Sequence, residues 1–158
     1  MTFRFATEAD APLILQFIRD LAAYEKMLDQ VVADEALLRQ QLFERRQAEV
    51  IFALEEGKEV GFALFFHNFS TFLGRSGLYL EDLFVLPEYR GKGYGKGLLA
   101  KLASVAVERG YGRMEWSCLD WNRPSIDFYK SLGAQPMDEW TVYRLTGETL
   151  NQLAKAAE

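Results

Sequence analysis

The sequence predicts an α/β fold in which helices flank one central sheet. Three observations predict it: short runs of alternating or continuous apolar residues, longer runs with apolar residues at helical spacing, and turn residues between them. The 158 residues are 49% hydrophobic and 26% charged, which is typical of a soluble chain that buries roughly two-thirds of its unfolded surface. The chain holds no internal repeat, linker or low-complexity tract. We therefore expect a single domain over residues 1–158.

The N-terminal third predicts one strand followed by two helices. Residues 2–6 alternate between apolar and polar side chains, as in a short strand. Asp10 stands where it can cap a helix that has Ala11 and Pro12 in its first turn. Apolar residues then recur at helical spacing: Ile14, Phe17, Ile18 and Leu21. A second amphipathic helix is expected over residues 34–43, with an inner face of Leu37, Leu38 and Leu42.

The middle of the chain predicts three strands. Residues 50–54 and 60–69 are strand-like and flank the turn-forming segment 55–58, so they form an antiparallel hairpin. A third strand covers residues 78–85 and ends before Pro87, which cannot donate a hydrogen bond to a neighbouring strand. A glycine-rich loop follows this strand.

The C-terminal part predicts three more helices and two more strands. A buried stripe of Leu98, Leu99, Leu102, Val105 and Ala106 marks a long helix that ends near Gly110 and Gly112. Strands are expected over residues 114–118 and 141–145, and helices over 124–132 and 150–157. The order β-α-α-β-β-β-α-β-α-β with a helical tail indicates a mixed α/β domain around one sheet.

Composition excludes several classes of function. The net charge is −5, with 18 basic and 23 acidic residues, which argues against a nucleic-acid-binding protein and favours neutral or cationic partners. Cys118 is the one cysteine and His67 the one histidine, so an internal disulfide and a Cys- or His-rich metal site are excluded. His67 lies in a strand-like apolar run, where a catalytic role is disfavoured. The N-terminus lacks a signal sequence and no apolar run reaches about 18 residues, so we expect a cytoplasmic protein without membrane partners.

The segment 78–96, LYLEDLFVLPEYRGKGYGK, is the most informative one. A strand runs into a loop with Gly91, Gly93 and Gly95, and the loop runs directly into a helix. Such a loop brings backbone N–H groups and the positive end of the helix dipole to an anion. A Walker A loop is excluded because Gly-Lys-Ser/Thr is missing, and the G-x-G-x-G spacing does not match the dinucleotide fingerprint. A third anionic cofactor is therefore expected.

The residues Arg90-Gly91-Lys92-Gly93-Tyr94-Gly95 match the Arg/Gln-x-x-Gly-x-Gly/Ala signature of the GCN5-related N-acetyltransferase (GNAT) superfamily. In that family the loop binds the pyrophosphate of acetyl-CoA. Residues 24–27, residues 78–85 and the segment from Trp121 to Lys130 further resemble the spermidine/spermine (diamine) and thialysine N-acetyltransferase subgroup. The similarity extends from about residue 6 to residue 150.

This resemblance implies a twisted, mixed, mostly antiparallel sheet of six to seven strands flanked by helices. It implies an enzyme that moves an acetyl group from acetyl-CoA to a primary amine of a small cationic acceptor, by direct attack in a ternary complex. The acceptor is a polyamine, a diamine or a thialysine-like amino acid. The resemblance also implies a homodimer and a reaction without a metal.

The reaction itself calls for a base. An alkyl amine has a pKa near 10.4, so forming its neutral nucleophile at pH 7 costs about 4.6 kcal/mol. Glu81 is ionised at neutral pH and matches the glutamate that acts as the base in the subgroup. The alternative interpretation is that Glu81 is only a solvent-exposed carboxylate of the strand. Asp82 points to the opposite face of a regular strand, so both carboxylates serve one site only if a bulge intervenes.

The resemblance carries the remaining roles. Tyr129 matches the tyrosine that protonates the coenzyme A sulfur, although a tyrosine that caps the core is the plain alternative. The expected cofactor contacts are Leu83, Phe84, Val85, Arg90, Gly91, Lys92, Gly93, Tyr94, Gly95, Lys96, Asn122, Pro124 and Ser125. The expected acceptor contacts are Tyr24, Glu25, Asp82, Glu115, Trp116 and Ser117. For Asn122 and Ser125, the alternative is that they only cap a helix. For Tyr24 and Glu25, the alternative is that they are ordinary surface residues at the end of a helix.

Departures from the subgroup leave the acceptor open. The segment 44–47, Glu-Arg-Arg-Gln, replaces a Gly/His/Pro-containing segment, Leu132 stands where an arginine is usual, and the bulky Trp116 narrows the expected acceptor channel. The alternatives are acetylation of a protein lysine or N-terminus, acetylation of an aminoglycoside, and a non-catalytic acyl-CoA-binding module. An acyl-cysteine route through Cys118 is disfavoured because no histidine is placed to activate it.

Overall fold

The computed structural model describes residues 1–157, which form two compact units, residues 1–117 and residues 118–157. The first unit contains β1 (Thr2–Phe5), α1 (Ala11–Tyr24), α2 (Glu35–Leu38), η3 (Arg39–Glu44), β2 (Glu49–Glu55), β3 (Lys58–Ser70), β4 (Arg75–Val85), α3 (Tyr94–Glu108) and β5 (Met114–Trp116). Short 3₁₀ turns lie at Glu8–Asp10, Leu28–Gln30 and Pro87–Tyr89. The second unit contains α4 (Arg123–Ser131) and α5 (Gly147–Lys155). The expectation of one domain over the whole chain stays a prediction.

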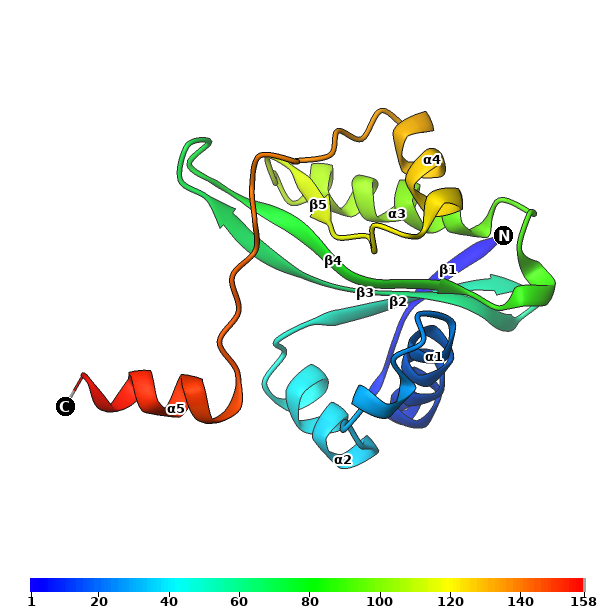
Figure 1. The fold of residues 1–158 in the computed structure, drawn as a ribbon. Helices are drawn as coiled ribbons and strands as arrows, with labels where there is room; N and C mark the ends of the chain where they lie inside the picture. Colours follow the sequence, from blue (N-terminus) through cyan, green and yellow to red (C-terminus); the bar gives the residue numbers. More distant parts are fainter. Residues whose placement is uncertain (158) are drawn as a thin grey trace. The chain divides into compact units, whose positions relative to one another are not determined.

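The first unit is built on a twisted sheet in the order β1-β2-β3-β4-β5 (Figure 1). Neighbouring strands are antiparallel, except that β5 runs parallel to β4. This confirms the mixed, mostly antiparallel sheet. Five strands are present in the described residues, where the sequence predicted six to seven.

The helices of the first unit lie on both faces of the sheet, α1 and α2 on one face and α3 on the other (Figure 1). On the α1 face, the Phe17 ring packs against Phe62 and Phe52 at centroid distances of 5.1 and 5.9 Å. All three side chains are buried. Each stabilises the fold by about 2–3 kcal/mol relative to an exposed ring. Phe84 and Leu64 belong to the same cluster, which fixes one face of β3 and β4 against α1.

Asp10 precedes α1, as predicted, but its carboxylate does not cap that helix. It accepts two hydrogen bonds of 2.8 Å from the Arg4 guanidinium and one of 2.7 Å from the backbone N–H of Thr7. Arg4 also donates to Glu59 at 2.7 Å. The expected cap is therefore wrong in detail, because the charged partner on β1 outcompetes the helix N–H groups for the carboxylate.

The helix expected over residues 34–43 changes its hydrogen-bond pattern part-way. Asp34 caps α2 by accepting from the N–H of Leu37 at 2.7 Å. After Leu38 the chain continues as the π-helix η3. Apolar spacing alone does not distinguish the two helix types at this length, so the expectation of one α-helix is corrected to an α-helical turn followed by a π-helix.

The hairpin of β2 and β3 has a tighter turn than the expected segment 55–58. Only Glu56 and Gly57 form it, with φ of 49° and 80°, and Glu55 pairs directly with Lys58. Two successive left-handed residues match the right-handed twist of the strands. Strand β4 begins at Arg75 instead of residue 78, and β5 is shorter than its expected range 114–118.

In the second unit, α4 begins at Arg123 with Asn122 as its cap, and α5 ends at Lys155, close to the expected helices. The strand expected over residues 141–145 is wrong, because this segment has no strand conformation. An apolar run becomes a strand only when another strand pairs with it, and no pairing to this run is present in the part of the chain that the structure describes. No helix within residues 1–157 is long and apolar enough to cross a membrane.

Candidate functional site

Glu81 is the extra residue of a β-bulge in β4. Leu64 of β3 pairs with Asp82, but the next residue, Phe65, pairs with Leu80, so Glu81 has no partner across the ladder. Asp82 consequently faces the same side of the sheet as Leu64, the side covered by α1. In a bulge, two successive residues oppose one partner, so their side chains need not alternate. The condition under which Glu81 and Asp82 serve one site is met.

Three carboxylates lie close enough to affect one another. Burial, together with the negative charges of Glu81 and Glu25, raises the pKa of Asp82 to about 7. Burial also raises the pKa of Glu25, which stands at the C-terminal end of α1. The helix dipole places partial negative charge at that end, so a carboxylate there is not stabilised. A cation bound among the three would relieve their mutual repulsion. In the part of the chain that is described, these and other His, Cys, Asp and Glu side chains form no group suited to a metal ion.

Arg90 joins the glycine loop to the end of α1 and to β4. Its guanidinium lies over the rings of Tyr24 and Phe84, 4.9 and 5.0 Å from their centroids. Its Nε donates to the carbonyl oxygen of Val85 at 3.0 Å. The predicted acceptor residue Tyr24 and the predicted cofactor residue Arg90 are therefore direct neighbours.

The loop and the start of α3 have the geometry of an anion cradle. Gly91 and Gly93 have φ of 78° and 89°, values that side chains other than glycine rarely allow. A Cβ added at Gly91, Gly93 or Gly95 would meet no atom within 4 Å, so this side of the backbone is open. The first backbone hydrogen bond of α3 runs from Gly97 to Gly93, which leaves the N–H groups of residues 94–96 without a helical acceptor. These residues fit the phosphates of acetyl-CoA.

Side chains around the loop contact the hairpin of β2 and β3. The buried Tyr94 donates its hydroxyl to Glu55 at 2.7 Å, and burial with this bond raises the pKa of Tyr94 to about 12. Lys92 lies 3.8 Å from the same carboxylate. The Tyr94 side chain thus points into the protein and holds the loop against the hairpin. If Tyr94 contacts a cofactor, it does so through its backbone.

The end of β5 is tied to β4 and β3. Ser117 shares a hydrogen bond of 2.9 Å with the hydroxyl of Tyr79, two residues before Glu81. The Glu115 carboxylate lies 3.0 Å from Arg113 and accepts from Asn68 at 3.4 Å, so its charge is compensated. Trp116 is half-buried at the end of this strand.

The second unit carries the other predicted residues. Asn122 caps α4 by accepting from the N–H of Ser125 at 3.4 Å, and Pro124 lies in the first turn of that helix. Tyr129 is half-buried on α4, with its ring 5.7 Å from Phe128. The capping function predicted for Asn122 is confirmed, and the roles of these residues toward a cofactor stay predictions.

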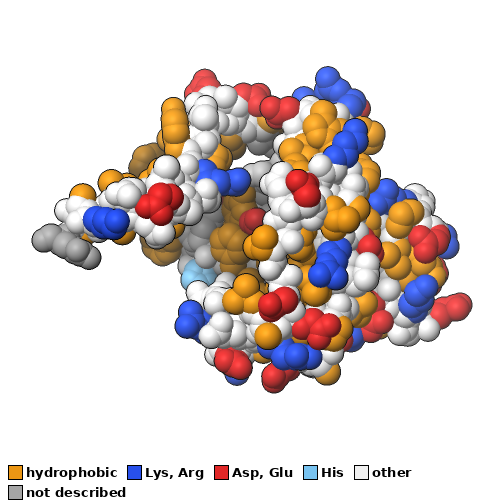
Figure 2. Space-filling view, turned by 60° about the horizontal axis from the view of Figure 1, so that its bottom comes forward, with side chains coloured by type: hydrophobic (Ala, Val, Ile, Leu, Met, Phe, Trp, Pro, Cys, Tyr) orange, Lys and Arg blue, Asp and Glu red, His pale blue; other side chains and the backbone are white. Residues whose placement is uncertain are grey.

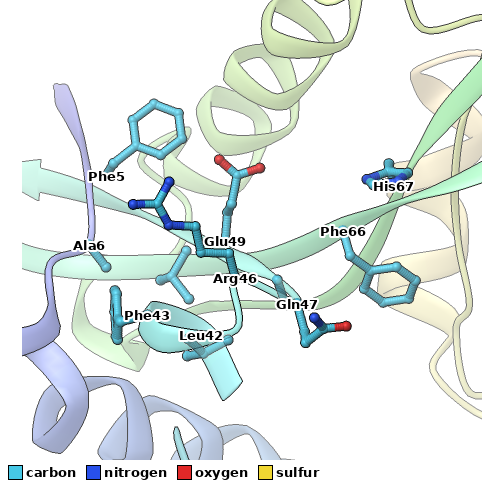
Figure 3. Close-up of a pocket in the computed structure, with 11 residues that line it drawn as sticks. Phe5, Ala6, Leu42, Phe43, Arg46, Gln47, Glu49, Phe66 and His67 are labelled. Carbon is cyan, nitrogen blue, oxygen red and sulfur yellow. The ribbon is translucent and has the colours of Figure 1, made fainter. Parts of the chain in front are cut away.

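A separate pocket of about 790 Å³ lies where η3 leads into β2. Figure 3 shows Arg46 extending toward Phe5 and Gln47 extending to the side of Phe66. None of its lining residues belongs to the glycine loop or to the carboxylate cluster. On the face of the molecule shown in Figure 2, cationic and anionic side chains are interspersed, with hydrophobic side chains between them.

Comparison with known proteins supplies the family. The model of the acetyltransferase (GNAT) family matches residues 15–134 of this chain. The chain belongs to this family. It is an N-acetyltransferase, and enzymes of the family take their acetyl group from acetyl-CoA.

Named relatives of the family support the subgroup. A thialysine N-epsilon-acetyltransferase of Bos taurus is 40% identical and aligns over 96% of this chain and 95% of its own length. An L-ornithine N5-acetyltransferase of Arabidopsis thaliana is 35% identical over 96% of this chain and 87% of its own. Among solved structures, an integron cassette protein from the mobile metagenome of V. cholerae superposes with a TM-score of 0.80 at 32% identity, over 98% of this chain and 97% of its own. The resemblance to the thialysine and spermidine/spermine subgroup is confirmed.

Sequence reasoning missed Lys58 and Tyr89 beside the loop. The ammonium group of Lys58 lies 3.5 Å from the Tyr89 hydroxyl and 5.3 Å from the centre of its ring. The two residues are 31 positions apart. The signal that could have found Lys58 is the two-residue turn at Gly57, which sets a cation at the end of the hairpin.

Proposed function

We propose that this protein acetylates a primary amine of a small cationic acceptor by direct attack on acetyl-CoA. The single observation that carries the proposal is the bulge at Glu81, which releases Glu81 and Asp82 from strict alternation in the strand that leads into the glycine loop. The acceptor class includes polyamines, diamines and amino acids with a terminal amine. The relatives named for thialysine and L-ornithine favour the amino acids.

Glu81 is the proposed base. Glu81 is exposed whereas Asp82 is half-buried, so Glu81 is the carboxylate that a solvated ammonium or a bridging water can reach. Taking the proton directly or through water produces the neutral amine, whose formation at pH 7 costs about 4.6 kcal/mol. The amine nitrogen then forms a bond to the thioester carbonyl carbon, the carbon–sulfur bond breaks with coenzyme A leaving as its thiolate, and the nitrogen loses its remaining extra proton to solvent.

Asp82, Glu25 and Tyr24 are proposed to hold the acceptor. A cation beside Asp82 favours the ionised carboxylate, so acceptor binding releases a proton from Asp82 near pH 7. Glu25 adds negative charge from the end of α1. The ring of Tyr24 already stacks on the guanidinium of Arg90, which links acceptor binding to the loop.

Acetyl-CoA is proposed to bind along the end of β4 and the loop. When bound, it supplies the acetyl group as an activated thioester. The open backbone at Gly91 and Gly93 and the N–H groups of residues 94–96 bind its phosphates. The backbone of residues 83–85 supplies an N–H for the oxyanion, and Tyr129 donates a proton to the leaving sulfur. Asn122, Pro124 and Ser125 contact the pantetheine arm.

A direct test measures thiol release from acetyl-CoA with thialysine, L-ornithine, lysine, putrescine, spermidine, spermine and a lysine peptide. We expect turnover with a small amine. Glu81→Gln and Tyr129→Phe each lower kcat by about 10²- to 10⁴-fold. Glu8→Gln removes the same charge from an exposed position in the first turn after β1 and serves as the control.

The outcome separates the competing functions. Turnover only with the lysine peptide indicates a protein acetyltransferase, and turnover only with an added aminoglycoside indicates a resistance-type enzyme. Tight binding of acetyl-CoA without turnover on any amine indicates an acyl-CoA-binding module. Unchanged kcat in Glu81→Gln contradicts the proposed base. Homodimerisation and a cytoplasmic location remain part of the proposal.

A further inference from the structure

The hairpin of β2 and β3 touches the loop that is proposed to bind the phosphates of acetyl-CoA. The turn at Glu56 and Gly57 sets Glu55 and Lys58 opposite each other at the tip. Three side-chain contacts then join the tip to the loop: Tyr94 to Glu55 at 2.7 Å, Lys92 to Glu55 at 3.8 Å and Lys58 to Tyr89 at 3.5 Å. Figure 1 shows the tip of this hairpin beside the segment that follows β4.

Two ammonium groups share the ring of Tyr89. Lys58 lies 5.3 Å and Lys92 5.1 Å from the centre of that ring. Glu55 compensates Lys92, and it also accepts the hydroxyl of Tyr94. Within residues 1–157, Lys58 forms no ion pair. Lys58 and Lys92 carry two positive charges and Glu55 carries one negative charge, so one positive charge beside the loop has no ion-pair partner within residues 1–157.

Two other acids of the same segments, Glu56 and Glu88, are exposed, and neither forms an ion pair with these lysines in the described part of the chain. Their negative charges therefore act on the lysines only through solvent. Bringing two like charges to one ring costs free energy unless an anion joins them. Acetyl-CoA carries two separate phosphate groups, the pyrophosphate and the 3′-phosphate. The glycine loop and the start of α3 are suited to hold one such group, and a flanking lysine pair is suited to hold negative charge beside it.

We propose that Lys58, which lies outside the glycine-loop motif, contacts a phosphate group of acetyl-CoA together with Lys92. This inference rests on the proposed function, because it takes acetyl-CoA as the ligand of the loop. Lys58 does not touch the reacting atoms. Its loss therefore weakens coenzyme binding and raises the KM for acetyl-CoA, while kcat at saturating coenzyme stays unchanged.

The test is calorimetric binding of coenzyme A and of 3′-dephospho-coenzyme A to the wild type, Lys58→Gln, Lys58→Arg and Lys101→Gln. Lys101 lies further along α3, so its variant makes the same charge change away from the loop. We expect Lys58→Gln to weaken coenzyme A binding by about 3- to 10-fold, with a smaller loss at high salt. Lys58→Arg retains most of the affinity, and Lys101→Gln retains it fully.

The two ligands identify the phosphate. If Lys58→Gln weakens coenzyme A but not the dephospho form, the contact is to the 3′-phosphate, and if both weaken equally, it is to the pyrophosphate. Wild-type binding of coenzyme A with no loss in Lys58→Gln beyond Lys101→Gln overturns the inference alone. Failure of the wild type to bind coenzyme A overturns the proposed function and the inference with it.

Discussion

The guanidinium of Arg90 lies 4.9 Å from the centre of the Tyr24 ring, so the last residue of α1 and the first residue of the glycine motif are in contact. The two residues come from segments that are predicted to bind different ligands, the amine at Tyr24 and the coenzyme at Arg90. Because of this contact, the end of α1 packs against the start of the glycine loop. A change at either residue is expected to affect the binding of both substrates.

Arg90→Ala tests this coupling. The variant loses the stacking on Tyr24 and Phe84 and the bond to the Val85 carbonyl, so we expect the KM for acetyl-CoA and the KM for the amine each to rise by about 3- to 10-fold. Arg90→Lys does not restore either value, because an ammonium lacks the planar guanidinium. Steady-state kinetics with both substrates varied provide the measurement, and a change in only one KM would contradict the coupling.

Asp82→Asn is expected to stabilise the protein at neutral and higher pH. Because the pKa of Asp82 is raised from 3.8 to about 7 by burial and by Glu81 and Glu25, the folded protein holds a proton that the unfolded chain has lost. The free energy of unfolding of the wild type therefore falls as the pH rises from about 4 to about 7. We expect Asp82→Asn to be more stable by about 1–3 kcal/mol at pH 8 and by little at pH 4. Denaturant unfolding at the two pH values measures this, and an equal difference at both would refute it.

Asp10→Asn is expected to have the opposite pH dependence. Hydrogen bonds from Arg4, together with the N–H of Thr7, lower the pKa of Asp10 from 3.8 to about 2. The stabilisation is therefore present above pH 4 and is lost as the pH falls through 2. We expect a loss of about 1–2 kcal/mol at pH 7 that disappears toward pH 2. Asp29→Asn, in an exposed 3₁₀ turn, is the control and should change stability at neither pH.

Glu56→Asn is expected to stabilise the hairpin of β2 and β3. Glu56 has a φ of 49°, which costs a glutamate more than an asparagine, and Asn-Gly is the preferred pair for this turn. We expect a gain of about 0.5–1 kcal/mol in the free energy of unfolding. Glu56→Gln removes the same charge without easing the backbone. If it stabilises the protein equally, the effect comes from charge and not from the turn.

Local patterns predicted most elements of the first unit because their signals lie within a few residues. Gly57 between two strand-like runs is enough for a hairpin, and Pro87 with Gly91 marks the end of β4. Glu81 and Asp82 were named as a pair from sequence, but only conditionally, because strand periodicity does not show where a bulge lies. The register of β3 and β4 supplies that information.

Non-local contacts account for what the sequence did not predict. Lys58 reaches Tyr89 only because the hairpin folds back beside the loop. Asp10 pairs with Arg4 instead of capping α1, since a charged partner from β1 binds its carboxylate more strongly than a helix N–H does. The apolar run at residues 141–145 has the composition of a strand, and composition does not supply the neighbour that a strand requires.

The unpaired residue Glu81 also changes which side chains of β4 face which side of the sheet. Before it, Leu80 pairs with Phe65, whose ring faces Arg109 at the end of α3, and after it Phe84 lies in the cluster with α1. Even-numbered side chains thus change sides at Glu81. If β4 kept all of its residues but paired regularly with β3, Asp82 and Phe84 would face the side of the sheet away from α1. The bulge is therefore as much a determinant of the enzyme as the identity of its acids.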